Sequence, residues 1–423
     1  MRRRLCALLL AVMLCVGCSA CSGTASTYQQ TAFYMGAGLD FPPMYSNAVR
    51  YEDMAALLSE SNLNLIIPMP MSSHRFDGNR DTFYAAFQEV GMDVIAYTDL
   101  LYMNHEPNVE QVQAEILRLR ETFPNVIGFF AWDEPRIEAY DSVKRIGDLI
   151  TETDLSALPL TCLLPSYNGE HTWYGQTEDT RYPYYVESFL EQVNPPVLTQ
   201  DFYPFQQYGL DTNMKENAYW VDLGYLTQLA QEQEKPYWQW ISGIQEWRYA
   251  ASDKMTMGHM RLQTNGALAY GAKGVLIFCA NECIITNDIE KSEKFEEMAV
   301  FNKQTRNIGN LLLSAEREAV YHNTGYKDFA AAYIDDLSAS EVIADAPVWG
   351  PGLVLSLFRE GDTRYLVIVS KNYMRAVSGT ITLKESCEVS AYNADTDTFE
   401  PATETASVPY ELDKGGIAVY RLN

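Results

Sequence analysis

Eight short apolar segments alternate with amphipathic segments between residues 33 and 280. The intervening stretches show helical spacing, as in Val112, Ile116 and Leu119. The apolar segments are Phe33–Phe41, Asn62–Pro70, Met92–Leu100, Val126–Asp133, Leu158–Tyr167, Pro196–Pro204, Pro236–Ser242 and Gly274–Ala280. Eight strand–helix units at a spacing of roughly 30–40 residues predict an α/β fold, the (β/α)8 TIM barrel.

A doubly wound parallel sheet is the main competitor for this alternating pattern. Such folds usually have fewer strands and a glycine-rich phosphate-binding turn after the first strand. The segment Met35–Gly38 resembles that turn, but Pro42 and Pro43 follow it closely. Two prolines there do not open a helix whose N-terminus could hold a pyrophosphate. The barrel is therefore the better interpretation.

The pattern changes after a long amphipathic stretch at residues 291–314, which we expect to close the barrel. From Leu353 onward the apolar segments are short and β-rich, and turn residues such as Glu360-Gly361-Asp362 separate them. This pattern is typical of an antiparallel β-sandwich. The sequence predicts a catalytic barrel at 32–314 and a small C-terminal β-sandwich at 315–423.

The N-terminus has the pattern of an export signal. Arg2, Arg3 and Arg4 precede an apolar run from Leu5 to Val16, which is too short for a mature transmembrane helix. We expect a signal peptide at 1–17 and a polar tether at 18–31. The boundary resembles a bacterial lipobox with Cys18 as the lipidated residue, although Cys15 stands where leucine is usual.

Cys21 is a second candidate for lipidation, and the alternative is a secreted protein with incidental cysteines. Either way the expected location is extracytoplasmic, and the only membrane contact we expect is a lipid anchor.

The charge balance excludes several classes of partner. The chain has 31 Lys+Arg against 56 Asp+Glu, a formal charge of −25, and no basic run beyond the leader. This argues against nucleic acid and against direct binding to an anionic membrane. Beyond the leader, four cysteines and five histidines show no zinc-type spacing, so we expect neither a metal site nor another cofactor.

The sharpest chemical signal is the pair Asp133-Glu134, preceded by Trp132 and followed by Pro135. Function in such barrels collects at the C-terminal ends of the strands, where this pair lies. A carboxylic acid in an apolar, Trp-lined pocket has a raised pKa and can donate a proton near neutrality. In a regular strand the two side chains would point to different sides. The alternative is a helix-capping Asp133 beside a solvated Glu134.

The segment Ile127–Pro135 resembles the fourth strand of the barrel glycoside hydrolases of the large retaining clan, in particular proteins similar to the family 42 beta-galactosidases. The stretches 261–275 and Asp201–Pro204 are also similar to parts of those enzymes. The resemblance implies that Glu134 is the acid/base, with Asp133 in place of the usual asparagine. It also implies that the C-terminal sandwich is an accessory domain.

The second carboxylate of that clan is a glutamate at the end of strand seven, where this chain has Gln239 and Ser242. Retaining chemistry needs a second carboxyl about 5 Å from the first, and inverting chemistry roughly 6.5–9.5 Å. Glu246 is our first choice, and Asp201 and Glu282, at the ends of strands six and eight, are the alternatives. Each has a structural interpretation as well, such as a Glu246–Arg248 ion pair.

Several residues near the predicted strand ends are candidates for sugar binding. Aromatic faces pack on the C–H faces of sugar rings, and carboxyl and amide groups bind hydroxyls. The candidates are Asp40, Trp132, Asp133, Asp201, Tyr203, Trp238, Gln239, Trp240 and Glu282. The alternative for the aromatic residues is barrel core, and Trp238 and Trp240 share one strand face. His74 and His105 are expected to be solvated loop residues.

Two functions remain open from the sequence. The first is an extracytoplasmic glycoside hydrolase that cleaves oligosaccharides without a cofactor. The second is a non-catalytic, carbohydrate-binding surface lipoprotein that kept the barrel and lost the nucleophile. A purely structural surface module fits the crowded carboxylates less well, because like charges placed together are costly.

Overall fold

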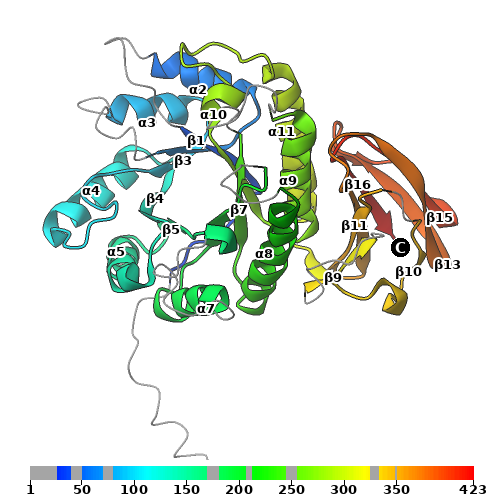
Figure 1. The fold of residues 1–423 in the computed structure, drawn as a ribbon. Coiled ribbons are helices and arrows are strands. Elements are labelled where there is room, and N and C mark those ends of the chain that lie inside the picture. The colour runs from blue at the N-terminus through cyan, green and yellow to red at the C-terminus, as the bar shows by residue number, and fades with distance from the viewer. Residues whose placement is uncertain are drawn as a thin grey trace, which may run out of the picture.

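The structure is a computed structural model that describes residues 26–39, 50–69, 80–168, 181–205, 212–243, 255–323, 333–347 and 350–423. Eight parallel strands form its first sheet (Figure 1). They are β1 (Tyr34–Leu39), β2 (Leu65–Pro68), β3 (Asp93–Ala96), β4 (Val126–Asp133), β5 (Leu158–Cys162), β6 (Leu198–Asp201), β7 (Tyr237–Ser242) and β8 (Gly274–Phe278).

The sheet closes into a barrel. Its order runs β5-β4-β3-β2-β1-β8-β7-β6, and the two ends meet through a parallel bridge between Leu163 and Gln200. The helices that alternate with these strands surround the ring (Figure 1). They are α2 (Tyr51–Glu60), α3 (Arg80–Glu89), α4 (Val109–Thr122), α5 (Tyr140–Thr153), α7 (Arg181–Gln192), α8 (Thr212–Glu232), α9 (Met257–Ala269), the single turn α10 (Ala280–Cys283) and α11 (Phe295–Leu311). The prediction of a (β/α)8 TIM barrel is confirmed.

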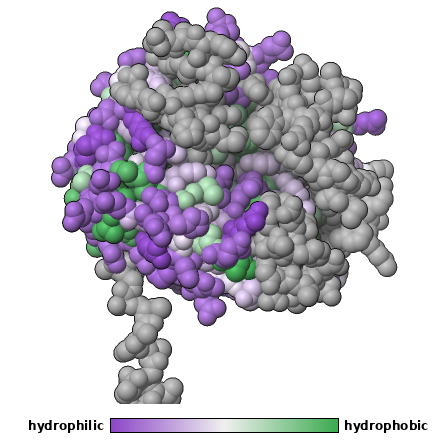
Figure 2. Space-filling view, turned by 60° about the vertical axis from the view of Figure 1, so that its left-hand side comes forward, coloured by the Kyte–Doolittle hydropathy of each residue, from purple (hydrophilic) through white to green (hydrophobic). Residues whose placement is uncertain are grey.

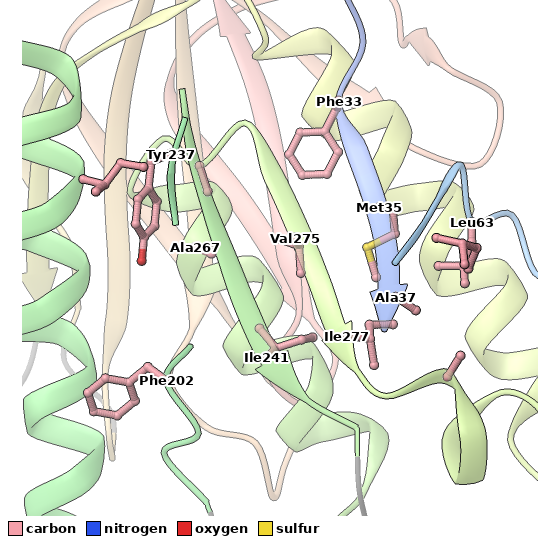
Figure 3. Packing of buried hydrophobic residues seen from close by; sticks show 14 of the residues in the cluster. Phe33, Met35, Ala37, Leu63, Phe202, Tyr237, Ile241, Ala267, Val275 and Ile277 are labelled. Carbon is pink, nitrogen blue, oxygen red and sulfur yellow. The ribbon is translucent and has the colours of Figure 1, made fainter. Parts of the chain in front are cut away.

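The main core lies between the strands and the surrounding helices. Ile241 of β7 and Ile277 of β8 point into this layer (Figure 3), and both are fully buried in one cluster with Ala267 of α9. Side chains on the opposite strand faces fill the interior of the ring, where Trp238 and Trp240 belong to a second cluster. Alternating side chains along each strand therefore serve two cores.

Residues 26–31, the described part of the predicted tether, lie against the base of the barrel. The Thr27 amide donates to the Leu155 carbonyl at 2.8 Å, and Gln30 Nε2 donates to the Lys273 carbonyl. The Trp238 indole N–H donates to Gln30 Oε1 at 2.9 Å. This part of the segment is thus fixed to the end of the barrel opposite the C-terminal strand ends.

The C-terminal region is antiparallel and packs around its own core. Its strands are β9 (Glu316–Asn323), β10 (Ile343–Asp345), β11 (Leu353–Glu360), β12 (Thr363–Ser370), β13 (Val377–Asn393), β14 (Thr398–Phe399), β15 (Thr403–Leu412) and β16 (Ile417–Leu422). The long strand β13 pairs with β10, β15 and β16, with a register shift between Thr382 and Cys387. One shared strand therefore connects the two layers of the predicted sandwich.

The two regions are joined mainly through α9. The Asn265 side-chain amide donates to the Gly415 carbonyl at 2.8 Å, and Arg261 forms an ion pair with Asp413 at 2.8 Å. A β-carbon on Gly258 would lie 2.1 Å from the Tyr373 carbonyl oxygen, so only glycine fits this contact.

The described surface on the α4–α5 side is largely hydrophilic, with apolar side chains in small groups (Figure 2). Within the described ranges, no helix is both long and apolar enough to cross a membrane.

Candidate active site

Three carboxyl groups meet at the C-terminal end of the barrel. Asp133 is the last residue of β4, Glu134 follows it, and Asp201 is the last residue of β6. Each residue is partly exposed as a whole, while Asp201 Oδ1 is buried. Active sites of this fold form at this end because the loops and strand ends converge there. The structure therefore brings together three of the residues that the sequence predicted.

The backbone at Glu134 explains how neighbouring residues face one site. Glu134 has a φ of 44°, in the left-handed region that residues with a side chain rarely adopt. Its amide still donates to the Cys162 carbonyl of β5 at 2.9 Å. The regular alternation of side chains ends with β4 at Asp133. The carboxyls of Asp133 and Glu134 therefore need not point to opposite faces of the sheet, as they would in a regular strand. Such backbone strain costs about 1–3 kcal/mol and is concentrated at functional sites.

Glu134 and Asp201 lie close enough for each carboxyl to shift the pKa of the other. Burial and the negative charge of Glu134 raise the pKa of Asp201 well above its usual range. Burial also raises the pKa of Glu134, while the hydrogen bond from Asp201 opposes that rise. The two carboxyls therefore titrate as a coupled pair, and their protons are held to a higher pH than those of ordinary carboxyls.

Asp133 adds a third acidic group to this pair. Burial, followed by the negative charge of Glu134, raises the pKa of Asp133 to about 7. The same three carboxyls, together with burial, raise the pKa of the Cys162 thiol, which is buried beside them on β5. Because like charges resist ionisation together, the cluster retains protons at a pH where ordinary carboxyls have lost them.

The raised pKa of Asp133 predicts how its substitution affects stability. In the unfolded chain its pKa is about 3.9, so the folded state binds this proton more tightly. The resulting stabilisation is complete below about pH 4 and is lost as the pH rises toward 7. We expect Asp133→Asn to raise the free energy of unfolding above pH 7, and the gain to shrink toward pH 4. Urea denaturation at several pH values measures this.

Asp362, exposed in the turn between β11 and β12, provides the control, since Asp362→Asn should change stability little at any pH. An effect of Asp133→Asn that is the same at pH 4.5 and pH 8 would contradict the assigned burial and coupling.

Aromatic rings surround the carboxyls. Tyr203 follows Asp201 by two residues, and its ring stacks on Phe278 at the end of β8, with centroids 6.0 Å apart. Tyr102 stacks on Phe130 of β4 at 5.6 Å. Burial, and then the charges of nearby carboxyls, raise the pKa of both tyrosine hydroxyls. Partly exposed rings beside buried acids are suited to packing against the C–H face of a sugar.

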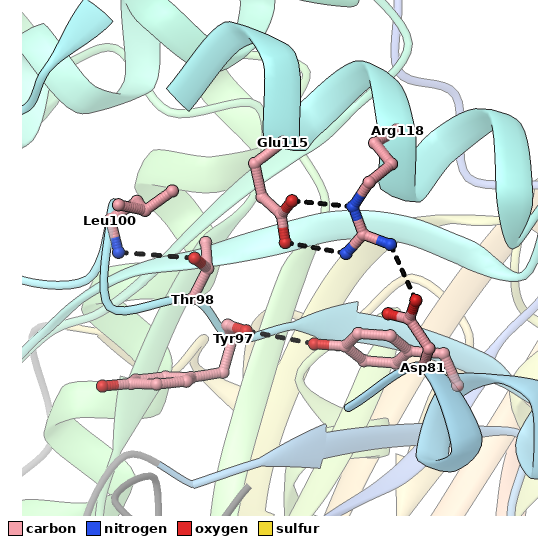
Figure 4. A network of polar contacts seen from close by, with 7 residues as sticks. Asp81, Tyr97, Thr98, Leu100, Glu115 and Arg118 are labelled. Atoms are coloured by element: carbon pink, nitrogen blue, oxygen red, sulfur yellow. Dashed lines mark hydrogen bonds and ion pairs between the residues drawn. The ribbon is translucent and has the colours of Figure 1, made fainter. Parts of the chain in front are cut away.

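The turn that carries Tyr102 is fixed by contacts from beneath. The Leu100 amide donates to Thr98 Oγ1 at 3.3 Å, and the Tyr84 hydroxyl donates to the Tyr97 carbonyl at 3.0 Å (Figure 4). Arg118 of α4 ties Glu115 to Asp81 of α3 in the same region, each ion pair at 2.8 Å (Figure 4). The two helices and the turn between β3 and α4 are thus held as one unit.

Trp240 is the one strand-seven tryptophan beside the carboxyls. It is the register partner of Asp201 on the neighbouring strand and is almost fully buried inside the barrel. A β-carbon on Gly38 would meet both Met69 and the Trp240 ring, which places the ring near the ends of β1 and β2. Within the described residues its indole N–H has no partner. Trp240 therefore forms part of the floor of the site.

The structure does not bring three other predicted residues to the site. Trp238 lies at the base, where its ring packs edge-on against Tyr34 at 5.1 Å. Gln239 points outward and is buried, with the Tyr237 hydroxyl donating to Gln239 Oε1 at 2.5 Å. Trp132 is covered as well, packed edge-on against His105 at 5.0 Å. These three side chains belong to the core, which was the structural alternative for the two tryptophans.

The remaining candidates lie outside the described residues. They are Asp40, Glu246, the alternative lipidation residues Cys18 and Cys21, and the side chain of Glu282. Within the described ranges, no group of three or more His, Cys, Asp or Glu side chains is arranged to hold a metal ion.

Tyr102 is the residue of this site that the sequence argument missed. It lies six residues beyond the end of β3, in a turn that has no motif of its own. The usable signal was its place after a strand end, since every loop on that side contributes to the mouth of a barrel.

No protein-family profile matches the chain, and no curated protein matches its sequence. Solved structures do match its fold. A protein described as a glycoside hydrolase superimposes with a TM-score of 0.50 at 11% identity, over 92% of each chain. A glycoside hydrolase of family 5 from Bacteroides vulgatus superimposes with a TM-score of 0.52 at 12% identity, over 92% of this chain and 89% of that one. The fold is therefore one found among glycoside hydrolases, and a closer likeness to family 42 is not confirmed.

Proposed function

We propose that this chain is a glycoside hydrolase in which Glu134 is the general acid/base. The observation that carries the proposal is the meeting of Asp133, Glu134 and Asp201 at the C-terminal end of the barrel, where burial raises the pKa of each carboxyl. Cleaving a glycosidic bond requires an acid that still holds its proton near neutral pH. The surrounding tyrosines Tyr102 and Tyr203 add the surfaces that sugar rings prefer.

The proposed reaction consumes one water for each bond cleaved. The bond between the anomeric carbon and the glycosidic oxygen breaks, and that oxygen takes a proton from Glu134. The hydroxyl of water ends on the anomeric carbon, and the remaining proton of the water restores the acid. Because the developing oxocarbenium ion is positive, the ionised members of an acidic cluster stabilise it.

Asp201 is suited to a different role from that of a nucleophile. A carboxyl whose pKa is raised well above its usual range keeps its proton, and a protonated carboxyl attacks poorly. We therefore assign Asp201 to tuning the pKa of Glu134, whose own proton is held by burial. Glu246 stays the predicted second carboxylate, with Glu282 as its alternative.

A non-catalytic, sugar-binding protein is the second candidate. It is favoured by β7, whose residues Tyr237–Ser242 include no carboxyl group. A panel of aryl glycosides with different sugars and both anomers separates the two functions when combined with calorimetric binding of the free sugars. Release of the aryl group by the wild type supports the hydrolase, whereas sugar binding without release from any member supports the binding protein.

We also propose that the chain is exported and anchored through Cys18, on the strength of the basic and apolar leader that precedes it. Cys18→Ala should move the protein from the membrane fraction to the soluble fraction of its native host, because it removes the acylated residue. Cys21→Ala should leave it in the membrane fraction. The reverse pattern would assign the anchor to Cys21, and no change in either variant would contradict a lipid anchor.

A further inference from the structure

The backbones of Glu134 and Asp201 are both held by one short segment, at the end of β5. The Glu134 amide donates to the Cys162 carbonyl at 2.9 Å, and the Asp201 amide donates to the Leu163 carbonyl at 3.2 Å. These two carbonyls belong to successive residues at the end of β5. The Leu163 amide in turn donates to the Thr199 carbonyl of β6 at 2.9 Å. The distance between Glu134 and Asp201 therefore depends on where this short segment is held.

Tyr185 of α7 fixes the segment on the side of Glu134. Its hydroxyl donates to the Pro135 carbonyl at 2.9 Å and accepts from the Leu164 amide at 3.2 Å. Pro135 directly follows Glu134, and Leu164 directly follows Leu163. The side chain is fully buried. A single hydroxyl thus ties the residue after the acid to the second residue after β5.

Asp222 of α8 fixes the same segment on the side of Asp201. Its Oδ2 accepts from Gln200 Nε2 at 2.7 Å and from the Ser166 amide at 2.9 Å. Gln200 directly precedes Asp201, and Ser166 begins a short 3-10 turn four residues after the end of β5. Asp222 is 1% exposed, so these bonds form away from solvent.

We propose that Tyr185 and Asp222 are positioning residues that set the separation of the Glu134 and Asp201 carboxyls from behind the site. This inference rests on the proposed function for its catalytic consequence. Tyr185 acts through the backbone beside Glu134, and Asp222 acts through the side chain of Gln200, the residue before Asp201. Hydrogen-bonded pairs depend steeply on distance, and a misplacement of about 1 Å at a reacting group can cost about 10²-fold in rate.

Tyr185→Phe tests the proposal, with Tyr219→Phe as the matched control. The Tyr219 hydroxyl is also buried, and it donates to the Gln263 carbonyl at 2.5 Å, so each variant loses one buried hydroxyl. We expect Tyr185→Phe to lower kcat by about tenfold or more and to shift the pH profile of kcat/KM. Tyr219→Phe should leave both unchanged despite a similar loss of melting temperature.

A measurement that does not need turnover separates this inference from the proposed function. Infrared titration of the carboxyl bands, assigned with Glu134→Gln, reports the titration midpoints of the two carboxyls. Glu134 is one of the groups that raise the pKa of Asp201. If the two carboxyls move apart, the higher of the two titration midpoints should therefore fall. That fall in Tyr185→Phe alone supports the proposal even if no glycoside is cleaved. Equal midpoints in Tyr185→Phe and Tyr219→Phe overturn it.

Asp222 supplies a second pair of variants if Tyr185→Phe does not fold. Asp222→Ala removes the acceptor for both donors and should lower the same midpoint. Asp222→Asn keeps one side-chain oxygen in place and should restore the wild-type midpoint. An Asp222→Asn variant that behaves like Asp222→Ala would overturn the assignment, because the positioning depends on that acceptor oxygen.

Discussion

Glu134→Gln is expected to lower kcat for glycoside cleavage by about 10²–10⁴-fold and to leave sugar affinity within a few-fold. Glutamine keeps the size of the side chain and can still hydrogen-bond to Asp201, but it has no proton to give to the leaving oxygen. The loss should be larger for poor leaving groups, such as a second sugar, than for a nitrophenolate. Steady-state kinetics on any glycoside that the wild type cleaves measure this effect.

Glu138 provides the matched control for this variant. It lies four residues along the same loop, is exposed, and occupies a short 3-10 turn. Glu138→Gln should retain wild-type kcat, since its carboxyl faces solvent. If Glu134→Gln keeps full activity on a poor leaving group, Glu134 is not the acid/base.

Trp238→Ala is expected to lower the free energy of unfolding by about 3–5 kcal/mol. Trp238 is fully buried at the base of the barrel, packs on Tyr34, and donates its indole N–H to Gln30. Truncation leaves a cavity between the interior side chains and the segment 26–31, and it leaves the Gln30 amide oxygen without that donor. Urea denaturation gives the change in unfolding free energy.

Leu117→Ala on α4 is the comparison, because Leu117 is 45% exposed and its truncation should change stability by less than about 0.5 kcal/mol. Trp238 was a sugar-binding candidate in the sequence, so the variant also tests its placement. If the variant binds sugar more weakly and its stability is unchanged, Trp238 is a sugar-binding residue and its position at the base of the barrel is contradicted.

The barrel could be predicted because its strands are apolar on both faces and its helices have a clear period. The prediction for β4, Val126–Asp133, matches the observed strand, whereas β5 and β6 end earlier than predicted. Apolar residues continue past those strand ends, as Leu163 and Leu164 do, because the first loop residues are buried at the mouth. Composition alone does not separate such residues from the strand.

The C-terminal strands were less visible in the sequence. The apolar segments Thr380–Leu383 and Val389–Tyr392 predict two short strands, but both lie in the single strand β13, where the exposed run Lys384-Glu385-Ser386 interrupts the apolar pattern at the register shift. β15 was missed because most of its outward residues are polar and it contains Pro409. A strand with one solvent-exposed face has apolar residues only at alternate positions, so its apolar pattern is weaker than that of a strand buried on both faces.

The sequence predicted which residues belong to the site, but not which of their carboxyls come together. A motif identified Glu134, and a strand-end position identified Asp201, but the close approach of their carboxyls depends on the left-handed backbone at Glu134. Nothing in the sequence specifies that φ angle. Alternation along Tyr237–Ser242 would have separated Gln239 from Trp238 and Trp240, since odd and even residues of a strand face opposite sides.

Hydrolysis itself is tested most directly with oligosaccharides in water enriched in oxygen-18. If the wild type is a glycoside hydrolase, mass spectrometry should show one labelled oxygen at the anomeric carbon of each new reducing end, and Glu134→Gln should yield almost no such product. Oligosaccharides that bind the wild type and are recovered intact and unlabelled would contradict the account.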